Sequence, residues 1–238
     1  MKLDILAIGV HPDDVELSCS GTLLKHIAMG KKCGIVDLTS GELGTRGSGP
    51  LRLEEAAAAA QILGISLRKN LGMLDGFFKN DVAHQLEIIK IIREYQPEII
   101  LCNAVSDRHP DHGRASQLVS EACFYSGLRK IETESEGKKQ DAWRPKAVYH
   151  YIQDRQLKPD FVVDITAFID KKMEAIQAFK SQFYNPDSRE PESPISVKNF
   201  LDVVKGKMSL FGRDAGFSYA EGFTVERSIG VTDLFDLK

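Results

Sequence analysis

Short apolar runs alternate with segments of helical spacing along most of this chain, and this alternation limits the possible fold more than any other feature. The apolar runs lie at residues 3–10, 33–38 and 99–102, and the helical segments that follow them lie at residues 12–29, 51–63 and 110–125. Nearly continuous apolar runs are typical of strands buried on both faces of a parallel sheet. We therefore expect one α/β domain over residues 1–238, with a Rossmann-like open, mostly parallel sheet and helices on both faces.

The remaining segments predict how this sheet continues. Pro12 at a first helical position predicts one helix up to about Met29, and Thr166 is suited to cap a helix that runs to about Gln182. Residues 129–145 are charged and poor in apolar side chains, which predicts an exposed loop. Further short strands are expected at residues 70–74, 147–152 and 161–164, and further helices at residues 82–95 and 196–210.

Composition excludes several classes of protein. The formal net charge of −3 gives no electrostatic basis for binding nucleic acid or an anionic membrane. No apolar run approaches the roughly 18 residues of a membrane helix, and the N-terminus lacks the pattern of a signal peptide. The four cysteines show no CxxC spacing and two lie in apolar runs, which favours reduced, buried thiols. We expect a cytoplasmic protein whose ligand is a small molecule.

The tripeptide His-Pro-Asp occurs twice, each time just after an apolar run. The first copy begins the block His11–Asp14, and the second begins the block His109–His112. In open parallel sheets ligands bind beyond the carboxyl ends of the strands, so both blocks and the polar stretch Thr39–Glu42 are expected to meet in one crevice. Two imidazoles with one carboxylate suit a catalytic zinc site that keeps a position for water, and the absence of clustered cysteines argues against a closed structural site.

The two blocks together resemble the LmbE/PIG-L family of zinc-dependent N-deacetylases, which remove acetyl groups from N-acetylglucosamine-containing substrates. The resemblance extends to Thr39–Glu42 and to Arg52–Ala56. Two further stretches, Lys180–Gln182 and Tyr219–Phe223, resemble the branch that deacetylates N-acetylglucosaminyl-malate in bacillithiol biosynthesis. The resemblance implies a homo-oligomer, a trimer or hexamer. It also implies one zinc ion per chain, although the same donor set can bind Fe²⁺ or Co²⁺.

Transferred to this sequence, the family pattern assigns a role to each residue of the two blocks. His11, Asp14 and His112 become the zinc ligands, and Asp13 becomes the general base. A protonated His109 stabilises the tetrahedral intermediate, a role that suits a cation facing an oxyanion. Asp111 is then expected to orient an imidazole, that of His109.

Three arginines are candidates for binding the substrate. The planar fork of a guanidinium matches a carboxylate, so an arginine suits an anionic aglycone such as malate. Arg52 is the first candidate, and Arg46 and Arg108 are the others.

Other functions remain open at this stage. Another N-acetyl sugar, such as diacetylchitobiose, is an alternative substrate. A non-catalytic protein that binds sugars in a deacetylase-like pocket is an alternative class, which Asp13 and His109 argue against because a binder needs neither. A nucleotide-binding enzyme is disfavoured because the first strand is not followed by GxGxxG.

Overall fold

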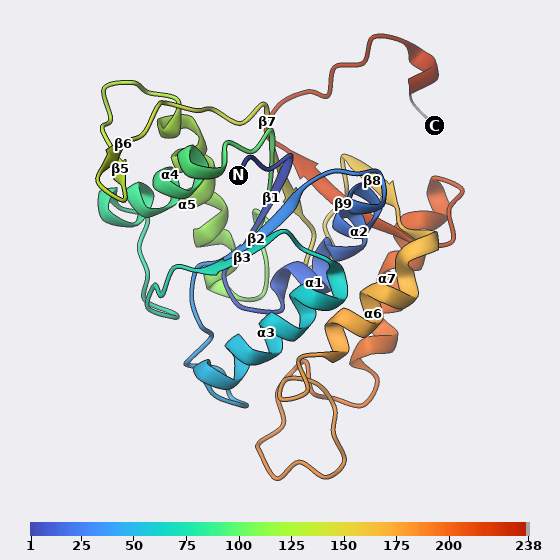
Figure 1. Cartoon of the computed structure of the whole chain (residues 1–238). Coiled ribbons are helices and arrows are strands. Elements are labelled where there is room, and N and C mark those ends of the chain that lie inside the picture. Colours follow the sequence, from blue (N-terminus) through green and yellow to red (C-terminus); the bar gives the residue numbers. More distant parts are fainter. Residues whose placement is uncertain (237–238) are drawn as a thin grey trace.

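A seven-stranded sheet forms the centre of the molecule, with helices on both of its faces (Figure 1). The structure is a computed structural model and describes residues 1–236. The strand order is β3-β2-β1-β4-β7-β9-β8, and the first five strands of that order run parallel. The predicted α/β fold with an open, mostly parallel sheet is therefore confirmed.

The bounds of the elements follow the predicted alternation. The strands of the large sheet are β1 (Ile5–Gly9), β2 (Cys33–Asp37), β3 (Leu67–Asn70), β4 (Ile99–Cys102), β7 (Ala147–Tyr151), β8 (Phe161–Asp164) and β9 (Ala220–Val225). The α-helices are α1 (Asp14–Ser18), α2 (Ser20–Ala28), α3 (Gly49–Leu63), α4 (Val82–Tyr95), α5 (Pro110–Ser126), α6 (Ile169–Gln177) and α7 (Phe200–Asp214). Short 3-10 helices η1 (Thr166–Phe168) and η2 (Leu234–Asp236) complete the described chain.

Strand β1 lies between β2 and β4, and the direction of the chain across the sheet reverses there. Ile5 pairs with Cys33 on one side and with Ile99 on the other. The connections from β1 lead outward to β2 and β3, whereas the chain returns to the opposite side of β1 to form β4. A crevice forms at such a switch point, beyond the carboxyl ends of the strands. The loops after β1 and β4 flank this crevice, and these loops contain the two His-Pro-Asp blocks.

The alternation of side chains along β1 builds a core on each face of the sheet. Leu6 and Ile8 pack into one cluster with apolar residues of α4 and α5. Ile5 and Ala7 point to the other face and pack with residues of α2, β2 and β7. The central strand is thus buried on both faces, as its continuous apolar sequence predicted.

The predicted helix 12–29 is wrong in one respect, because the structure divides it into α1 and α2 at Cys19. Lys172 donates to the carbonyl oxygens of Glu16 and Leu17 at the end of α1. The carboxylate of Glu221 accepts from the first backbone N–H groups of α2. These backbone groups at the break are therefore satisfied by residues that are distant in the sequence, so local spacing could not reveal the break.

Other boundaries also differ from the sequence prediction. The third strand lies at 67–70 rather than 70–74, and the last helix lies at 200–214 rather than 196–210. The prediction that Thr166 caps a helix was wrong, because the backbone N–H of Thr166 donates to the Asp164 carboxylate and a 3-10 turn that begins at Thr166 precedes α6. Helix α6 ends at Gln177 rather than at about Gln182.

Three strand pairings were not predicted. The segment 129–145 contains the small hairpin of β5 (Glu134–Ser135) and β6 (Lys138–Lys139). Strand β9 inserts between β7 and β8 and runs antiparallel to both. This strand joins β8 to the rest of the sheet and places Glu221 and Gly222 beside the pocket.

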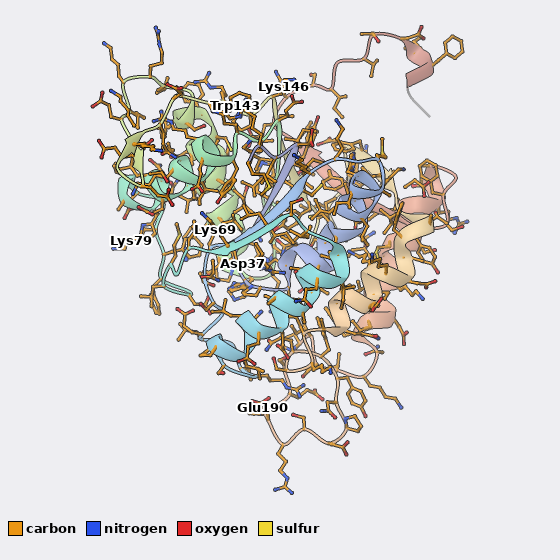
Figure 2. All side chains as sticks on the ribbon, in the orientation of Figure 1. Asp37, Lys69, Lys79, Trp143, Lys146 and Glu190 are labelled. Carbon is orange, nitrogen blue, oxygen red and sulfur yellow. The ribbon has the colours of Figure 1, made fainter. Side chains whose placement is uncertain are left out.

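The loop between α6 and α7 extends from the body of the molecule, with Glu190 near its tip (Figure 2). It is tied back to the loop before α3, since Glu190 accepts a hydrogen bond from the backbone of Gly47. All four cysteines are buried free thiols, as predicted. Over residues 1–236, the helices are too short or too polar to cross a membrane.

Candidate metal centre and active-site pocket

A pocket of about 540 Å³ opens at the crevice between β1 and β4. One end is formed by the two His-Pro-Asp blocks. The loop 43–46 and residues of α7 also line the pocket. A pocket of this size accommodates a drug-sized ligand.

Asp14 lies at the centre of the polar end and is fully fixed by hydrogen bonds. Its Oδ2 accepts from the backbone N–H groups of Val10 and His11, each at 3.0 Å, and from the Asn103 amide at 2.9 Å. Its Oδ1 accepts from the Gln153 amide at 3.1 Å. Burial favours the neutral acid, but the neighbouring His112 and His11 hold the pKa of Asp14 well below its usual range. The side chain is therefore a rigid carboxylate.

His11 and His112 flank Asp14, and each ring is held from behind by a second carboxylate. His11 Nε2 lies 3.0 Å from Asp75 Oδ1, and His112 Nδ1 lies 2.6 Å from Asp107 Oδ2. Although burial opposes it, the carboxylates raise the pKa of His11 to about 9 and that of His112 to about 10. The second nitrogen of each ring faces Asp14, and the rear carboxylate fixes which nitrogen this is.

The three side chains have the arrangement of a metal site. His11 Nδ1 lies 3.7 Å from Asp14 Oδ2, and His112 Nε2 lies 3.3 Å from Asp14 Oδ1. Ligand atoms around a tetrahedral zinc at about 2.0–2.1 Å are separated by roughly 3.3 Å. Carboxylates behind ligating imidazoles are the usual support of such sites, because they orient the ring and raise its basicity. The residues therefore fit a zinc ion, with His11, Asp14 and His112 as its holders.

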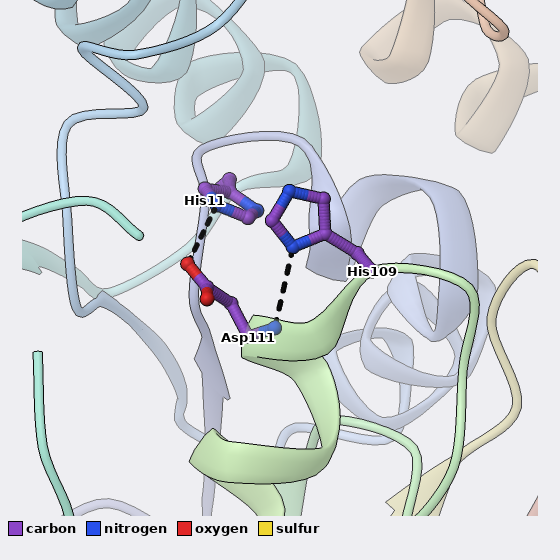
Figure 3. Close-up of side chains that lie close together, drawn as sticks. All are labelled: His11, His109 and Asp111. Carbon is purple, nitrogen blue, oxygen red and sulfur yellow. Dashed lines mark hydrogen bonds and ion pairs between the residues drawn. The ribbon is translucent and has the colours of Figure 1, made fainter. Parts of the chain in front are cut away.

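A second group of possible ligands, His11, His109 and Asp111, fits less well (Figure 3). The Asp111 carboxylate lies 3.8 Å from His11, but it already accepts from the Gly76 backbone at 2.9 Å and from the Arg114 guanidinium at 2.8 Å. Asp111 was expected to orient His109 through its carboxylate. That contact is absent among the described residues, since the carboxylate faces His11 and only the Asp111 backbone reaches His109.

His109 is placed as a hydrogen-bond donor to the pocket. Its Nδ1 accepts from the backbone N–H of Asp111 at 3.3 Å, so this nitrogen has no proton and the proton of the neutral ring lies on Nε2. Burial and the charges of His11 and His112 lower the pKa of His109. The hydrogen bond to Nδ1 favours a neutral imidazole with its proton on Nε2, in contrast to the protonated ring expected from the sequence.

Asp13 adjoins the cluster but belongs to neither group of possible ligands. Its backbone has φ 125°, a conformation that a residue with a side chain adopts only at a cost. The carboxylate is buried and bonded to the Arg52 guanidinium at 2.8 Å. Burial raises the pKa of Asp13 to about 6, against the opposing charge of Arg52. A group that titrates near neutrality can both accept and return a proton.

The first block therefore differs from the second in backbone geometry. Asp13 is the N-cap of α1, and Pro12 precedes the helix. In the second block His109 is the N-cap of α5 and Pro110 is its first residue. The expectation that both prolines begin a helix holds only for Pro110.

The three arginines line the pocket, and each is engaged within the protein. Arg52 donates to Asp13 and, at 2.6 Å, to the carbonyl of Pro12. Gly41 permits this position, because a Cβ there would lie 2.1 Å from the guanidinium. Arg108 pairs with Asp154. Arg46 is bonded to a backbone carbonyl and lies 3.8 Å from Glu190.

Four supporting residues were not identified from the sequence: Asp75, Asn103, Asp107 and Gln153. Asn103 directly follows the last residue of β4, so the rule that strand ends meet at one edge could have found it. Asp107 lies two residues before the second block, where it could have been noticed as a partner for an imidazole. Asp75 falls in a turn after the misplaced third strand, and nothing local distinguishes it.

Comparison with known proteins relates this chain to a family of de-N-acetylases. Residues 6–123 match the family model described as PIG-L, GlcNAc-PI de-N-acetylase. A diacetylchitobiose deacetylase of Thermococcus kodakarensis is 29% identical over 92% of this chain and 81% of its own length. A probable N-acetyl-alpha-D-glucosaminyl L-malate deacetylase 2 of Bacillus anthracis is 26% identical over 75% of this chain and 81% of its own. The crystal structure of the conserved protein TT1542 from Thermus thermophilus is 34% identical, covers 98% of both chains and superposes with a TM-score of 0.86.

Proposed function

The chain belongs to the PIG-L family of de-N-acetylases, and from that membership we propose that it hydrolyses the acetamide of an N-acetylglucosaminyl conjugate with a bound zinc ion. The observation that supports this most directly is the position of Asp13. It is a buried carboxylate beside the three possible metal ligands, held by Arg52 and not by the cluster. A protein that only binds sugars has no need of such a group.

His11, Asp14 and His112 would hold the zinc ion. When bound there, zinc supplies a Lewis acid that polarises the acetamide carbonyl and lowers the pKa of water toward about 7. Asp13 takes the proton of the attacking water and later returns it to the departing amine, as the C–N bond breaks to give acetate.

His109 donates from Nε2 to the oxygen that becomes negative as water attacks. We assign this role to the neutral ring, because Nδ1 already accepts the Asp111 N–H. The salt bridge from Arg52 keeps the Asp13 carboxylate in one orientation. Asp111 orients His109 through its backbone N–H, while its carboxylate lies 3.8 Å from His11.

Two conjugates are the first candidates for the substrate. The relative from Bacillus anthracis supports the malate conjugate expected from the sequence, and the relative from Thermococcus kodakarensis supports diacetylchitobiose. Arg46, Arg52 and Arg108 are all engaged in internal contacts, so a malate carboxylate would have to displace one of their partners. The cytoplasmic location and the trimeric or hexameric assembly stay predictions.

The test is acetate release from both conjugates by the zinc-loaded protein, with the zinc content measured on the same sample. Asp13→Asn should lower kcat by at least about 100-fold and leave one zinc ion per chain. Asp170→Asn, an exposed carboxylate on α6, is the matched control and should behave as wild type. Full activity in Asp13→Asn would exclude Asp13 as the base. Full activity after chelation would exclude the metal, and sugar binding without any acetate release would favour the non-catalytic alternative.

A further inference from the structure

The pocket continues beyond the metal ligands, and its distant part is apolar. Six side chains from α7 and the segment before it form this part, which we call the apolar arm: Ile195, Phe200, Val203, Val204, Met208 and Phe211. The arm is continuous with the polar end, because both belong to the same pocket of about 540 Å³. A ligand whose amide lies at the metal ligands can therefore reach the arm.

The arm is formed by one face of α7. Phe200, Val204 and Phe211 follow the spacing of a single helical face. All three are only half-buried, and Val203 is 57% exposed. Large apolar side chains thus keep accessible surface inside a pocket, where a ligand can cover them.

Charge at this end of the pocket is used internally. Lys207, which lies on α7 between Val204 and Met208, donates to the carbonyl oxygens of Gln153 and Asp154. Arg108 pairs with Asp154. Within residues 1–236, every lysine or arginine that lines the pocket has such an internal partner. The arm therefore offers apolar contact and no free cation for an acidic group.

We propose that the apolar arm binds an alkyl or aryl group attached to the acylated amino sugar, and that it selects substrates bearing such a group. The inference rests on the proposed deacetylase function and specifies its substrate class. Each methylene that moves from water into the arm favours binding by about fourfold. A flexible chain of several carbons that is only partly buried should therefore gain at least about tenfold.

The apolar group can come from two parts of the substrate. It can be the aglycone on the anomeric carbon, or it can be an N-acyl chain longer than acetyl. In the second case the same hydrolysis releases the longer carboxylate, with water supplying the hydroxyl to the acyl carbon and the proton to the amine. Hexyl N-acetyl-β-glucosaminide and N-hexanoylglucosamine separate these sources when each is compared with the corresponding methyl glycoside or N-acetylglucosamine.

The experiment measures the ratio of kcat/KM for each hexyl compound to that of its short counterpart on the zinc-loaded protein. Wild type should give a ratio of at least about ten for one of the two pairs. Val203→Asp places a charge in the arm at an exposed position and should bring this ratio to about one. Phe200→Ala, which shortens the wall without adding charge, should lower it by a smaller factor. Val82→Asp, 69% exposed at the start of α4 and outside the pocket, should keep the wild-type ratio.

The outcomes separate this inference from the proposed function. Turnover of the short compounds with ratios near one for both pairs would overturn the inference and leave the deacetylase function standing. An equal fall of the ratio in Val82→Asp would overturn it as well. If none of the compounds is hydrolysed, the proposed function fails. Calorimetric binding of both hexyl compounds and their short counterparts to wild type and Val203→Asp then decides the inference, which is wrong if neither hexyl compound binds wild type more tightly than its short counterpart.

Discussion

Removing one partner of the buried ion pair between Lys172 and Glu221 should be among the most destabilising single changes in this protein. The two side chains are 0% and 1% exposed, and their charged atoms lie 2.7 Å apart. The Lys172 ammonium also donates at 2.8 Å and 2.9 Å to the carbonyls of Glu16 and Leu17, so all three of its N–H donors are used. The pair joins α6 and β9 to the break between α1 and α2.

Lys172→Met keeps the length of the side chain but removes its charge and donors. The Glu221 carboxylate then stays buried with only two backbone N–H groups, from Gly21 and Thr22. The Leu17 carbonyl loses the Lys172 donor, whereas the Glu16 carbonyl keeps the hydrogen bond from the Ser20 hydroxyl. Breaking a buried pair in this way typically costs about 3–5 kcal/mol. For a domain of this size, that loss corresponds to a fall in Tm of roughly 6–20 °C.

The assay is equilibrium unfolding in urea, with the slope compared between variants so that only the midpoint is interpreted. Lys171→Met, an exposed neighbour on α6, is the matched control and should change the free energy of unfolding by less than about 0.5 kcal/mol. Lys172→Met combined with Glu221→Gln should recover at least about 1 kcal/mol, because the uncompensated charge is gone. A loss below about 1 kcal/mol in Lys172→Met, or strict additivity in the double variant, would refute the reasoning.

Three further predictions concern the site and its surroundings. Asp107→Asn should weaken zinc affinity by about 10–100-fold in a chelator competition, because the ring of His112 loses the carboxylate that orients it; unchanged affinity would contradict this role. The free energy of unfolding in urea should be about 1 kcal/mol higher for Asp13→Gly than for Asp13→Ala, because glycine adopts φ 125° without strain. Equal free energies of unfolding would show that the strain is negligible. The pKa of His150 is raised to about 11, because Cys102, Glu226 and the Asn103 carbonyl outweigh the effect of burial. The protonated imidazole therefore stabilises the folded state fully below about pH 6.5, and this contribution is lost as the pH rises toward 11. The free energy of unfolding should accordingly fall between pH 7 and pH 10 by at least about 1 kcal/mol more in wild type than in His150→Gln, and parallel pH profiles would count against a charged His150.

The strand–helix order of this protein was readable from the sequence because it depends on local periodicity. The continuous apolar runs of β1, β2 and β4 mark strands buried on both faces, and each is followed by a helical segment. Strand β9 was not predicted from the sequence. Its place between β7 and β8 is an antiparallel insertion from the end of the chain, and no local pattern specifies the neighbours of a strand.

The two His-Pro-Asp blocks could be located from the sequence, since they follow strands whose ends meet, and the resemblance to the family assigned His11, Asp14 and His112 within them as metal ligands. Asp75, the carboxylate behind His11, could not be identified from the sequence, because it reaches that imidazole across the fold from 64 residues away. Asp107 lies only five residues from His112 and could have been noticed as its partner. Arg52 illustrates the same limit. Its sequence neighbourhood suggested a substrate ligand, whereas the structure places its guanidinium against Asp13.

By itself, the sequence determined the α/β class, the edge of the sheet where the chemistry lies, and the residue types that gather there. Only the tertiary structure decided which carboxylate supports which imidazole, which nitrogen of His109 has the proton, and that α1 and α2 are separate helices. Several of these features depend on contacts between groups that are far apart in the chain, such as Lys172 with Glu16 and Asp75 with His11. Periodicity encodes which face of an element is buried, and packing alone sets what lies against that face.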